Sequence, residues 1–290
     1  MTASLNPYIS HFGEEFDAEK SSQYRMAIQF SLGGLSYALL DTHSNRIIAL
    51  ECYLSDLLSD SDDLFRTLER ALESKGLNGK DFLSVTGLYD NRICTLVPEP
   101  LFNEAQQAKY LDFSFQIPEN YAVAAESIEK CACYNVFAYP KTLHDKMLAK
   151  WKDAQFKHTS SIHLSKVMKD ANESYVSVMV RNRDFDTAIK KNGKLLFFNN
   201  FKFNTKEDFA YFLLFAMEQN NISGTDTLVR FSGLIRPASE IIDLCGRYVK
   251  DIRFVEDPQV SKALDEVPFQ YYYILYQALK QESARPQDKG

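Results

Sequence analysis

The chain repeats one pattern of strands and turns, and the first copy is MAIQFSLGGLSYALLD (26–41) followed by NRIIALECYL (45–54). The second copy is YVSVMVRNRDFDTAIKKN (175–192) followed by GKLLFFNNFKF (193–203). In each copy, apolar residues alternate along short segments that turn-forming residues separate, which predicts three strands joined by two hairpins. We expect an amphipathic helix after each copy. A duplicated three-strand meander with a covering helix predicts two similar α/β lobes that face each other across a cleft.

The turns and the covering helices have their own sequence signals. Gly33 and Gly34 supply the backbone freedom that a tight hairpin turn requires, and residues 182–184 turn the chain in the second copy. A leucine stripe follows residues 61–63 and predicts the first helix. Thr205 and Asp208 resemble a capping box that opens the second helix.

The remaining periodicity predicts further elements and a division of the chain. Strands are expected at 82–88, 92–97, 121–127, 132–139, 155–158, 227–231 and 249–255, and helices at 104–110, 140–151, 161–168, 237–245 and 268–281. We expect residues 1–22 to be a lead-in without a folded element, and 23–171 and 172–258 to be the two lobes. Residues 259–290 are expected to hold a helix that packs back on the first lobe and a frayed tail.

Composition narrows the classes of function. The 290 residues are 45% hydrophobic and 25% charged, which is typical of a globular protein long enough for two lobes. The formal charge of −6 offers no concentrated positive face for nucleic acid. We find no apolar run near ~18 residues and no basic-then-apolar leader, so we expect a cytoplasmic protein without a membrane span. Five cysteines, an odd number, predict reduced thiols.

The order of strands and helices resembles the actin-like ATPase fold, a ribonuclease-H-like architecture with mixed sheets that sugar kinases and the pilus-assembly protein PilM share. VRFSGLIRP (229–237) resembles the strand-loop-helix at which that superfamily meets adenosine. Residues 82–98 resemble the strand-turn-strand that opens a subdomain of PilM-like proteins, and PFQY (268–271) begins the closing helix. Over nearly its full length the chain is similar to a bacterial family of unknown function that is assigned this fold.

The resemblance implies a nucleotide site between the lobes, in which each hairpin turn carries an Asp-plus-Gly loop for phosphate and hydrated Mg²⁺. The candidate ligands of Mg·ATP are then Ser31, Gly33, Gly34, Asp184, Asp186 and Gly233. The first turn lacks an acid and the second lacks a glycine, while the adenosine loop keeps Gly233 alone. We therefore expect that inherited Mg·ATP hydrolysis is lost.

Ordinary structural roles compete with these assignments and are favoured. Two glycines in a hairpin are more often a turn than a phosphate cradle, and Asp184 and Asp186 are expected to be solvated charges on a solvent-facing loop. A scaffold would fill its cleft with side chains and leave an apolar patch outside, whereas an enzyme would keep carboxylates and open volume together. The side chains expected to fill the cleft are Leu32, Leu35, Arg183 and Phe185.

Cys131 and Cys133 suggest a zinc site with three histidines further along the chain, at His144, His158 and His163. One residue between the thiolates is too few for the usual zinc knuckle, and alternation would place both thiols on one face of a strand. We expect buried core cysteines and no metal site. The motifs G-x-S-x-G and G-x-x-x-x-G-K are absent from the sequence.

The function predicted from these features is a non-catalytic, degenerate actin-like protein that acts as a protein-binding or assembly scaffold, without catalytic residues or a cofactor. The partner is expected to be another protein, and a second copy of the same chain, forming a homo-oligomer, is the alternative partner. The last helix carries Tyr271, Tyr272, Tyr273 and Tyr276, whose rings we expect to cover the seam between the lobes, and a partner-binding surface is the less favoured alternative. The alternative is a kinase-like or ATPase protein that binds Mg·ATP in the cleft. A third is a ribonuclease-H-like RNA-associated protein, which needs clustered strand acids where the sequence offers chiefly Glu51.

Overall fold

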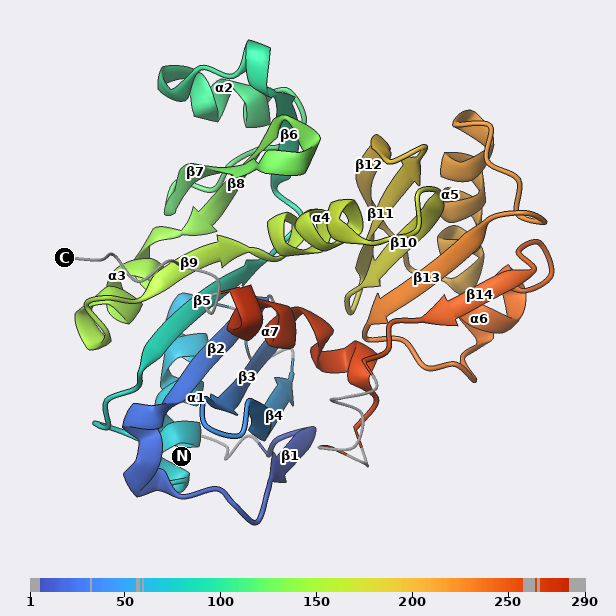
Figure 1. Ribbon diagram of the computed structural model, residues 1–290. Helices are drawn as coiled ribbons and strands as arrows, with labels where there is room; N and C mark the ends of the chain where they lie inside the picture. Colours follow the sequence, from blue (N-terminus) through green and yellow to red (C-terminus); the bar gives the residue numbers. More distant parts are fainter. Residues whose placement is uncertain are drawn as a thin grey trace.

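The computed structural model describes residues 6–31, 33–55, 58, 60–257, 264 and 267–281, and these form two lobes connected through helices that lie between them (Figure 1). Within this part of the chain the β-strands form three sheets, two in the first lobe and one in the second. No helix in the same ranges is long and apolar enough to cross a membrane.

The main sheet of the first lobe has six strands in the order β1-β4-β3-β2-β5-β9. Their bounds are β1 (Ile9–Phe12), β2 (Tyr24–Ser31), β3 (Gly34–Asp41), β4 (Arg46–Leu54), β5 (Ser84–Asp90) and β9 (Gln155–His158). Strands β2, β3 and β4 form the predicted antiparallel meander, and β5 and β9 add to it in parallel. Residues of these strands are buried on both faces of the sheet, as in a central layer covered on two sides.

The expectation that residues 1–22 contain no folded element is wrong. Strand β1 pairs antiparallel with β4 and places Ile9 opposite Cys52, and a 3-10 helix follows at Ala18–Gln23. A four-residue strand is too short to show alternation in the sequence, and it forms because the edge of β4 supplies hydrogen-bonding partners.

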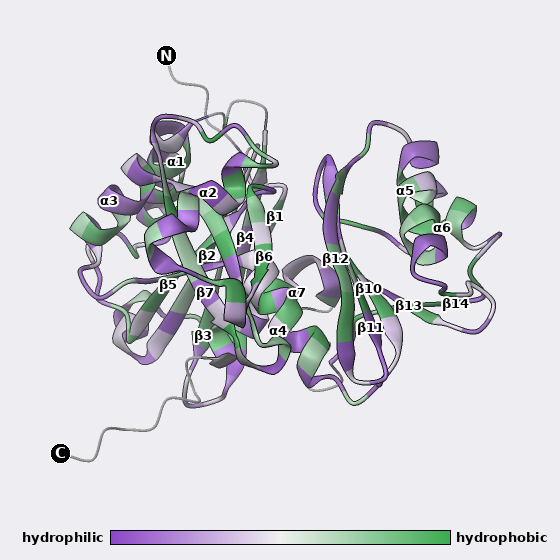
Figure 2. Cartoon of the chain, turned by 90° about the horizontal axis from the view of Figure 1, so that it is seen from above, coloured by the Kyte–Doolittle hydropathy of each residue, from purple (hydrophilic) through white to green (hydrophobic). Residues whose placement is uncertain are grey.

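Helices cover the two faces of this sheet (Figures 1 and 2). Alternation along β2 sends Met26 and Ile28 to the core that α1 (Ser61–Ser74) covers, and Ala27 to the core that α7 (Phe269–Gln281) covers. The helices α3 (Lys141–Lys150) and α4 (Thr159–Lys169) also belong to this lobe. The predicted leucine stripe of α1 is confirmed, because its leucines lie in the core of the lobe.

A small antiparallel sheet extends from the first lobe (Figure 1). Its order is β6-β8-β7, with β6 (Cys94–Pro98), β7 (Tyr121–Ile128) and β8 (Cys133–Pro140). The short helix α2 (Gln107–Asp112) packs on it, and Leu111 of that helix is fully buried. This extension supplies one wall of the space between the lobes.

The second lobe has one five-stranded sheet in the order β12-β11-β10-β13-β14. Its strands are β10 (Tyr175–Val180), β11 (Asp184–Lys191), β12 (Lys194–Lys202), β13 (Leu228–Gly233) and β14 (Asp251–Phe254). The helices α5 (Lys206–Gln219) and α6 (Glu240–Cys245) cover the face turned away from the first lobe (Figure 2). The capping box of Thr205 and Asp208 at the start of α5 is confirmed.

The two large sheets repeat one topology: an antiparallel meander whose first strand also pairs in parallel with a later strand. At the end of the parallel pair, Ser31 lies opposite Asp90 in the first lobe and Val180 lies opposite Gly233 in the second. Duplication therefore brings these strand ends together between the lobes. The exact limits 23–171, 172–258 and 259–290 stay proposals.

Candidate functional site

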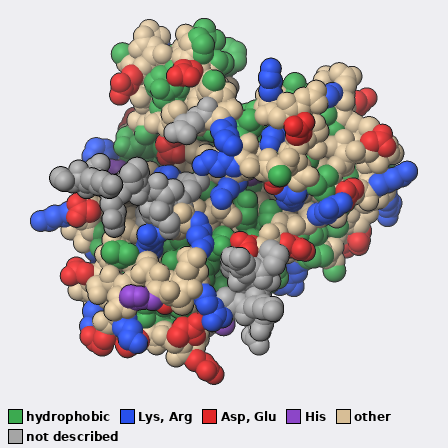
Figure 3. All heavy atoms as spheres, in the orientation of Figure 1, with side chains coloured by type: hydrophobic (Ala, Val, Ile, Leu, Met, Phe, Trp, Pro, Cys, Tyr) green, Lys and Arg blue, Asp and Glu red, His purple; other side chains and the backbone are tan. Residues whose placement is uncertain are grey.

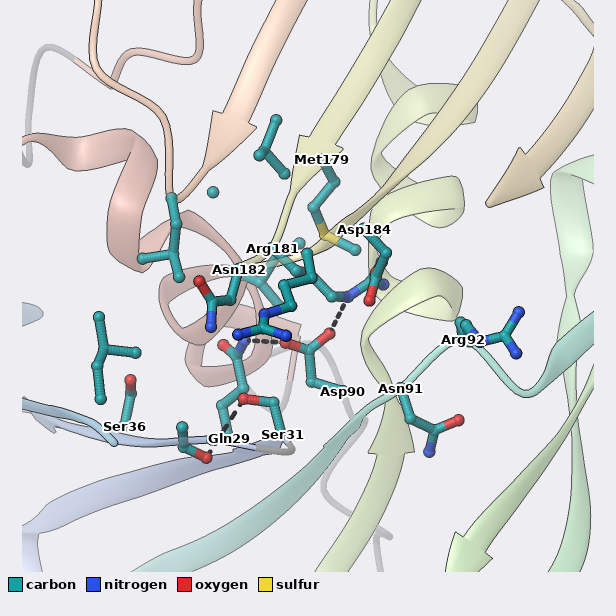
Figure 4. Close-up of a pocket in the computed structure, with 18 of the residues that line it drawn as sticks. Gln29, Ser31, Ser36, Asp90, Asn91, Arg92, Met179, Arg181, Asn182 and Asp184 are labelled. Atoms are coloured by element: carbon teal, nitrogen blue, oxygen red, sulfur yellow. Dashed lines mark hydrogen bonds and ion pairs between the residues drawn. The ribbon is translucent and has the colours of Figure 1, made fainter. Parts of the chain in front are cut away.

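A cavity of about 580 Å³ lies between the lobes, where the ends of these strands meet (Figure 4). Of the six candidate residues, five line it: Ser31, Gly33, Gly34, Asp184 and Gly233. A volume of this size is within the range of small-molecule sites. The structure therefore brings together residues that are about 150 to 200 positions apart in the sequence.

Arg181 is the central charged group of this site. It directly follows β10, and its guanidinium reaches across to Asp90 at the end of β5 in the other lobe (Figure 4). The same group donates from Nη1 to Asp184 Oδ1 at 2.9 Å and to Asp186 Oδ1 at 2.8 Å, and from Nη2 to Asp186 Oδ2 at 2.9 Å. Its side chain is only 7% exposed. One buried cation thus joins three carboxylates from two lobes.

Hydroxyl and amide groups donate further hydrogen bonds to the oxygens of Asp90 and Asp186. At the start of α4, Thr159 Oγ1 donates to Asp90 Oδ1 at 2.8 Å and Ser160 Oγ donates to Asp186 Oδ2 at 2.6 Å. Gln29 Nε2 donates to Asp90 Oδ2 at 2.7 Å. The oxygens of both buried carboxylates therefore already have partners from the protein.

The pKa shifts follow from this arrangement. Burial raises the pKa of Asp186, but attraction to Arg181 outweighs it, so the pKa lies below the ordinary value. Burial alone would lower the pKa of Arg181, and Asp186 and Asp90 instead raise it well above the ordinary value. For Asp184 burial is the largest effect and raises the pKa. The cluster is a desolvated ion pair network that holds Arg181 charged.

The first hairpin turn has the predicted glycines, and its backbone is already hydrogen-bonded. Gly33, at φ +78°, donates its N–H to the carbonyl of Leu58 at 2.9 Å and accepts from the N–H of Ser55 at 2.9 Å. Ser31 Oγ donates to the carbonyl of Gly34 at 3.3 Å. A phosphate cradle needs backbone N–H groups that point outward without a partner, and Gly33 does not offer one.

Gly233 meets a close backbone approach of the protein itself. Its φ is +86°, and a Cβ atom there would lie 2.0 Å from the carbonyl oxygen of Val180 on the neighbouring strand. That same carbonyl accepts the N–H of Leu234 at 2.8 Å. The glycine is required for the pairing of β10 with β13.

The expectation that Asp184 and Asp186 are solvated charges on an exposed loop is wrong. The turn occupies residues 181–183, and β11 begins at Asp184. Alternation then directs Asp186 inward, where it is fully buried and paired with Arg181. It lies behind Arg181 and does not line the cavity.

The prediction of a filled cleft is also wrong for two of its side chains. Phe185 points to the opposite face of the sheet, with its ring centroid 4.1 Å from that of Phe209. Leu35 is buried in the core of the first lobe, whereas Arg183 lines the cavity. Leu32 lies outside the described residues.

Sequence reasoning missed Arg181 and Asp90, the two residues that join the lobes. Each stands at the carboxyl end of a buried strand, after VSVMV (176–180) and VTGLY (85–89). A charge directly after a buried strand is the signal that could have found them, because those strand ends meet in open α/β sheets. The pairing of one with the other depends on how the lobes are placed.

The cysteine and histidine pattern separates into unrelated structural roles. Cys131 ends a 3-10 helix and Ala132 has a φ of +48°, so Cys131 is not part of a strand, contrary to the expected alternation. Cys133 is nonetheless buried at the start of β8. His158 Nδ1 accepts the N–H of Ser160 at the start of α4. Within the described ranges no group of three His, Cys, Asp or Glu side chains is arranged to hold a metal ion.

Comparisons of the sequence and of the fold with known proteins give a family and several solved structures of similar fold. The sequence model of a family described as "Protein of unknown function (DUF3822)" matches residues 13–252. No curated protein matches the chain. A Bacteroides thetaiotaomicron protein with an actin-like ATPase fold and unknown function is similar at a TM-score of 0.77 and 18% identity, covering 91% of this chain and 98% of that one.

Two further solved structures share the fold at lower identity. The PilM–PilN type IV pilus biogenesis complex contains a chain similar at a TM-score of 0.60 and 10% identity, covering 90% of this chain and 99% of that one. Component A of the Acidaminococcus fermentans (R)-2-hydroxyglutaryl-CoA dehydratase is similar at a TM-score of 0.51 and 9% identity, with coverage of 91% and 100%. At such identities the likeness shows the actin-like ATPase fold alone.

Proposed function

The chain belongs to the family described as "Protein of unknown function (DUF3822)" and has the actin-like ATPase fold, and on that premise we propose that it is a non-catalytic binding protein. In this proposal the nucleotide machinery has degenerated and the protein acts by binding another protein, as a scaffold. We propose a cytoplasmic location, and a second copy of the chain is the other candidate partner.

The observation that carries the proposal is the position of Arg181. A Mg²⁺ ion bound between the lobes would require carboxylate oxygens that are open to it. Here the guanidinium of Arg181 already pairs with carboxylate oxygens of Asp90, Asp184 and Asp186. Arg181 supplies the positive charge that a bound metal ion would otherwise supply. Unlike a metal ion, the arginine is part of the chain and cannot dissociate from the site.

The outer surface supports a protein partner. Large apolar side chains are exposed on the small sheet extension, where Phe113 is 94% exposed and Leu101 is 69% exposed. Figure 3 shows hydrophobic side chains gathered over that extension. Tyr211 on α5 is a further exposed aromatic residue. Apolar surface of this kind is typical of contact sites. PilM, a protein of the same fold, occurs in a complex with PilN.

A nucleotide-binding role remains the second candidate, because the cavity is open and is lined by Ser31, Gly33, Gly34 and Gly233. The ribonuclease-H-like hypothesis has weaker support. Glu51 is 1% exposed and accepts hydrogen bonds from Tyr37 and Tyr53, and Lys75 pairs with it at 3.4 Å. It does not line the cavity.

The test is thermal unfolding of the full chain with Mg·ATP, with Mg·ADP and with Mg²⁺ alone. A ligand at ~100 times its Kd would raise the free energy of unfolding by about 2.7 kcal/mol, or a few degrees in Tm. We expect no Mg²⁺-dependent shift in the wild type. A dose-dependent shift with Mg·ATP would refute the proposal.

The Arg181→Ala variant makes the test sharper. It leaves Asp90, Asp184 and Asp186 without their cation, so Mg²⁺ alone should now raise its Tm by at least a few degrees. Arg183→Ala is the matched control, because Arg183 lies two residues away and forms no ion pair with a described residue. The wild-type arm decides the proposal if the Arg181 variant does not fold.

A further inference from the structure

The cavity has an apolar floor formed by elements of the first lobe. It is lined there by Ile9 of β1, by Leu50 and Leu54 of β4, and by Ile274 and Leu275 of α7. Leu50, Ile274 and Leu275 belong to the buried core between the sheet and α7, and Leu54 is 37% exposed. Contact between water and this apolar lining costs free energy, so this end of the cavity favours an apolar ligand group.

The other end of the cavity carries three further basic side chains, while the carboxylates that line the cavity, Asp90 and Asp184, pair with Arg181. Arg92, Arg183 and Lys202 line it, and none of the three forms an ion pair with a described residue, unlike Arg181. The two lobes contribute to the cluster together, because Asn200 Nδ2 on β12 donates to the carbonyl of Arg92 at 3.0 Å. We call these three residues the cationic rim.

The cationic rim lies at the mouth of the cavity. Arg183 and Lys202 are exposed, and the guanidinium of Arg92 lies over the ring of Phe115 at 5.6 Å. Figure 3 shows Lys and Arg side chains gathered around the hollow between the lobes. Like charges at the edge of a low-dielectric hollow attract an anion and orient it toward the cavity.

We infer that the cavity binds an amphipathic anion without a metal ion: a carboxylate or phosphate head on the cationic rim and an apolar chain on the floor formed by Ile9, Leu50, Leu54, Ile274 and Leu275. The inference rests on the proposed non-catalytic role, because Arg181 leaves no carboxylate for a metal. A small hydrophilic anion would leave the floor in water. A neutral apolar molecule would leave the cationic rim without a counter-charge.

Isothermal titration calorimetry of the full chain in EDTA tests this site. The probes are decanoate and decyl phosphate, below the concentrations at which they form micelles, with 1-decanol and inorganic phosphate as comparisons. At least one of the two amphipathic anions should bind. The anion that binds more tightly shows whether the site prefers a carboxylate or a phosphate head group. Decanol and inorganic phosphate should each bind at least about tenfold more weakly, since each lacks one half of the interaction.

Two variants assign the binding to the site. Arg183→Ala combined with Lys202→Ala should weaken binding by about tenfold or more, as expected for lost charge-assisted hydrogen bonds. Leu54→Asp should also weaken it, and Leu54 is 37% exposed, so the substitution is compatible with folding. Lys194→Ala, an exposed lysine of the same strand as Lys202, is the matched control and should leave binding unchanged.

Absence of binding by both anions would overturn the inference. So would equal binding of decanol, or an unchanged Kd in the double variant. None of these outcomes contradicts the proposed function. The proposed function is refuted by a different result, namely stabilisation of the wild type by Mg·ATP. Binding that the double variant and Leu54→Asp both weaken would establish the amphipathic site.

Discussion

At the scale of single residues, the protein is distinguished by buried polar groups that hold one another in place. Arg181 and its three aspartates form one such set, and removing one partner of a buried ion pair destabilises proteins by about 3–5 kcal/mol. Near it, His163 Nε2 lies 2.8 Å from Ser177 Oγ, and the ring is almost fully buried. Burial is the largest effect on His163 and lowers its pKa from 6.5 to about 4.

We predict that His163 makes the free energy of unfolding depend on pH. Unfolded chains take up a proton at this histidine below its ordinary pKa, whereas the folded protein does not until about pH 4, so acid favours unfolding. The stability of the wild type relative to His163→Gln should therefore fall as the pH falls from 6.5 toward 4, by at most about 1.4 kcal/mol per pH unit. Urea unfolding at a series of pH values measures this difference.

The control for this measurement is His43→Gln, because His43 is exposed at a turn. The wild type, His163→Gln and His43→Gln are measured over the same pH range. Parallel curves for wild type and His163→Gln would contradict the prediction.

At the scale of elements, strand alternation decides what reaches the cleft. On β11 the neighbours Phe185 and Asp186 point to opposite faces, the first into the core beneath α5 and the second to Arg181. The parallel pairing of β10 with β13 ends at Val180 and Gly233, where the two backbones are too close for a side chain. The edge of the cleft thus depends on one glycine.

We predict that Gly233→Ala destabilises the protein by about 3 kcal/mol or more, because the added methyl meets a backbone carbonyl and the φ is positive. Gly79→Ala is the matched control, since Gly79 has a φ of +76° and an added methyl there would have no described atom within 4 Å. It should lose only about 1–2 kcal/mol from backbone strain. Chemical denaturation of both variants checks this, and equal losses would mean that the close approach to Val180 is unimportant.

At the scale of the whole molecule, α7 ties the end of the described chain to its beginning. It packs on the sheet of the first lobe and against β13 of the second (Figure 1). Tyr272 of α7 is 1% exposed and belongs to the core that Ala27, Ala38 and Leu40 also form. The helix predicted at 268–281 is confirmed at Phe269–Gln281, and its side chains lie in a core of the first lobe.

We predict that Tyr272→Ala lowers the free energy of unfolding by about 3–5 kcal/mol, as for other buried aromatic side chains. Tyr211→Ala, at a tyrosine that is 61% exposed, should change it by less than about 0.5 kcal/mol. Urea unfolding followed through Trp151, which packs against the core on the other face of the same sheet, reports the effect. Similar shifts in the two variants would show that α7 does not hold the molecule together.

The sequence by itself determined the two meanders, their covering helices and the capping box, because alternation, helical stripes and turn residues act within a few positions of one another. Five of the six residues that it suggested as ligands also line one cavity. The tertiary structure alone decided that Arg181 meets Asp90 and that Asp186 is fully buried beside Arg181. Arg181 and Asp90 lie 91 positions apart, and their contact depends on how the two lobes are oriented, which no local pattern encodes.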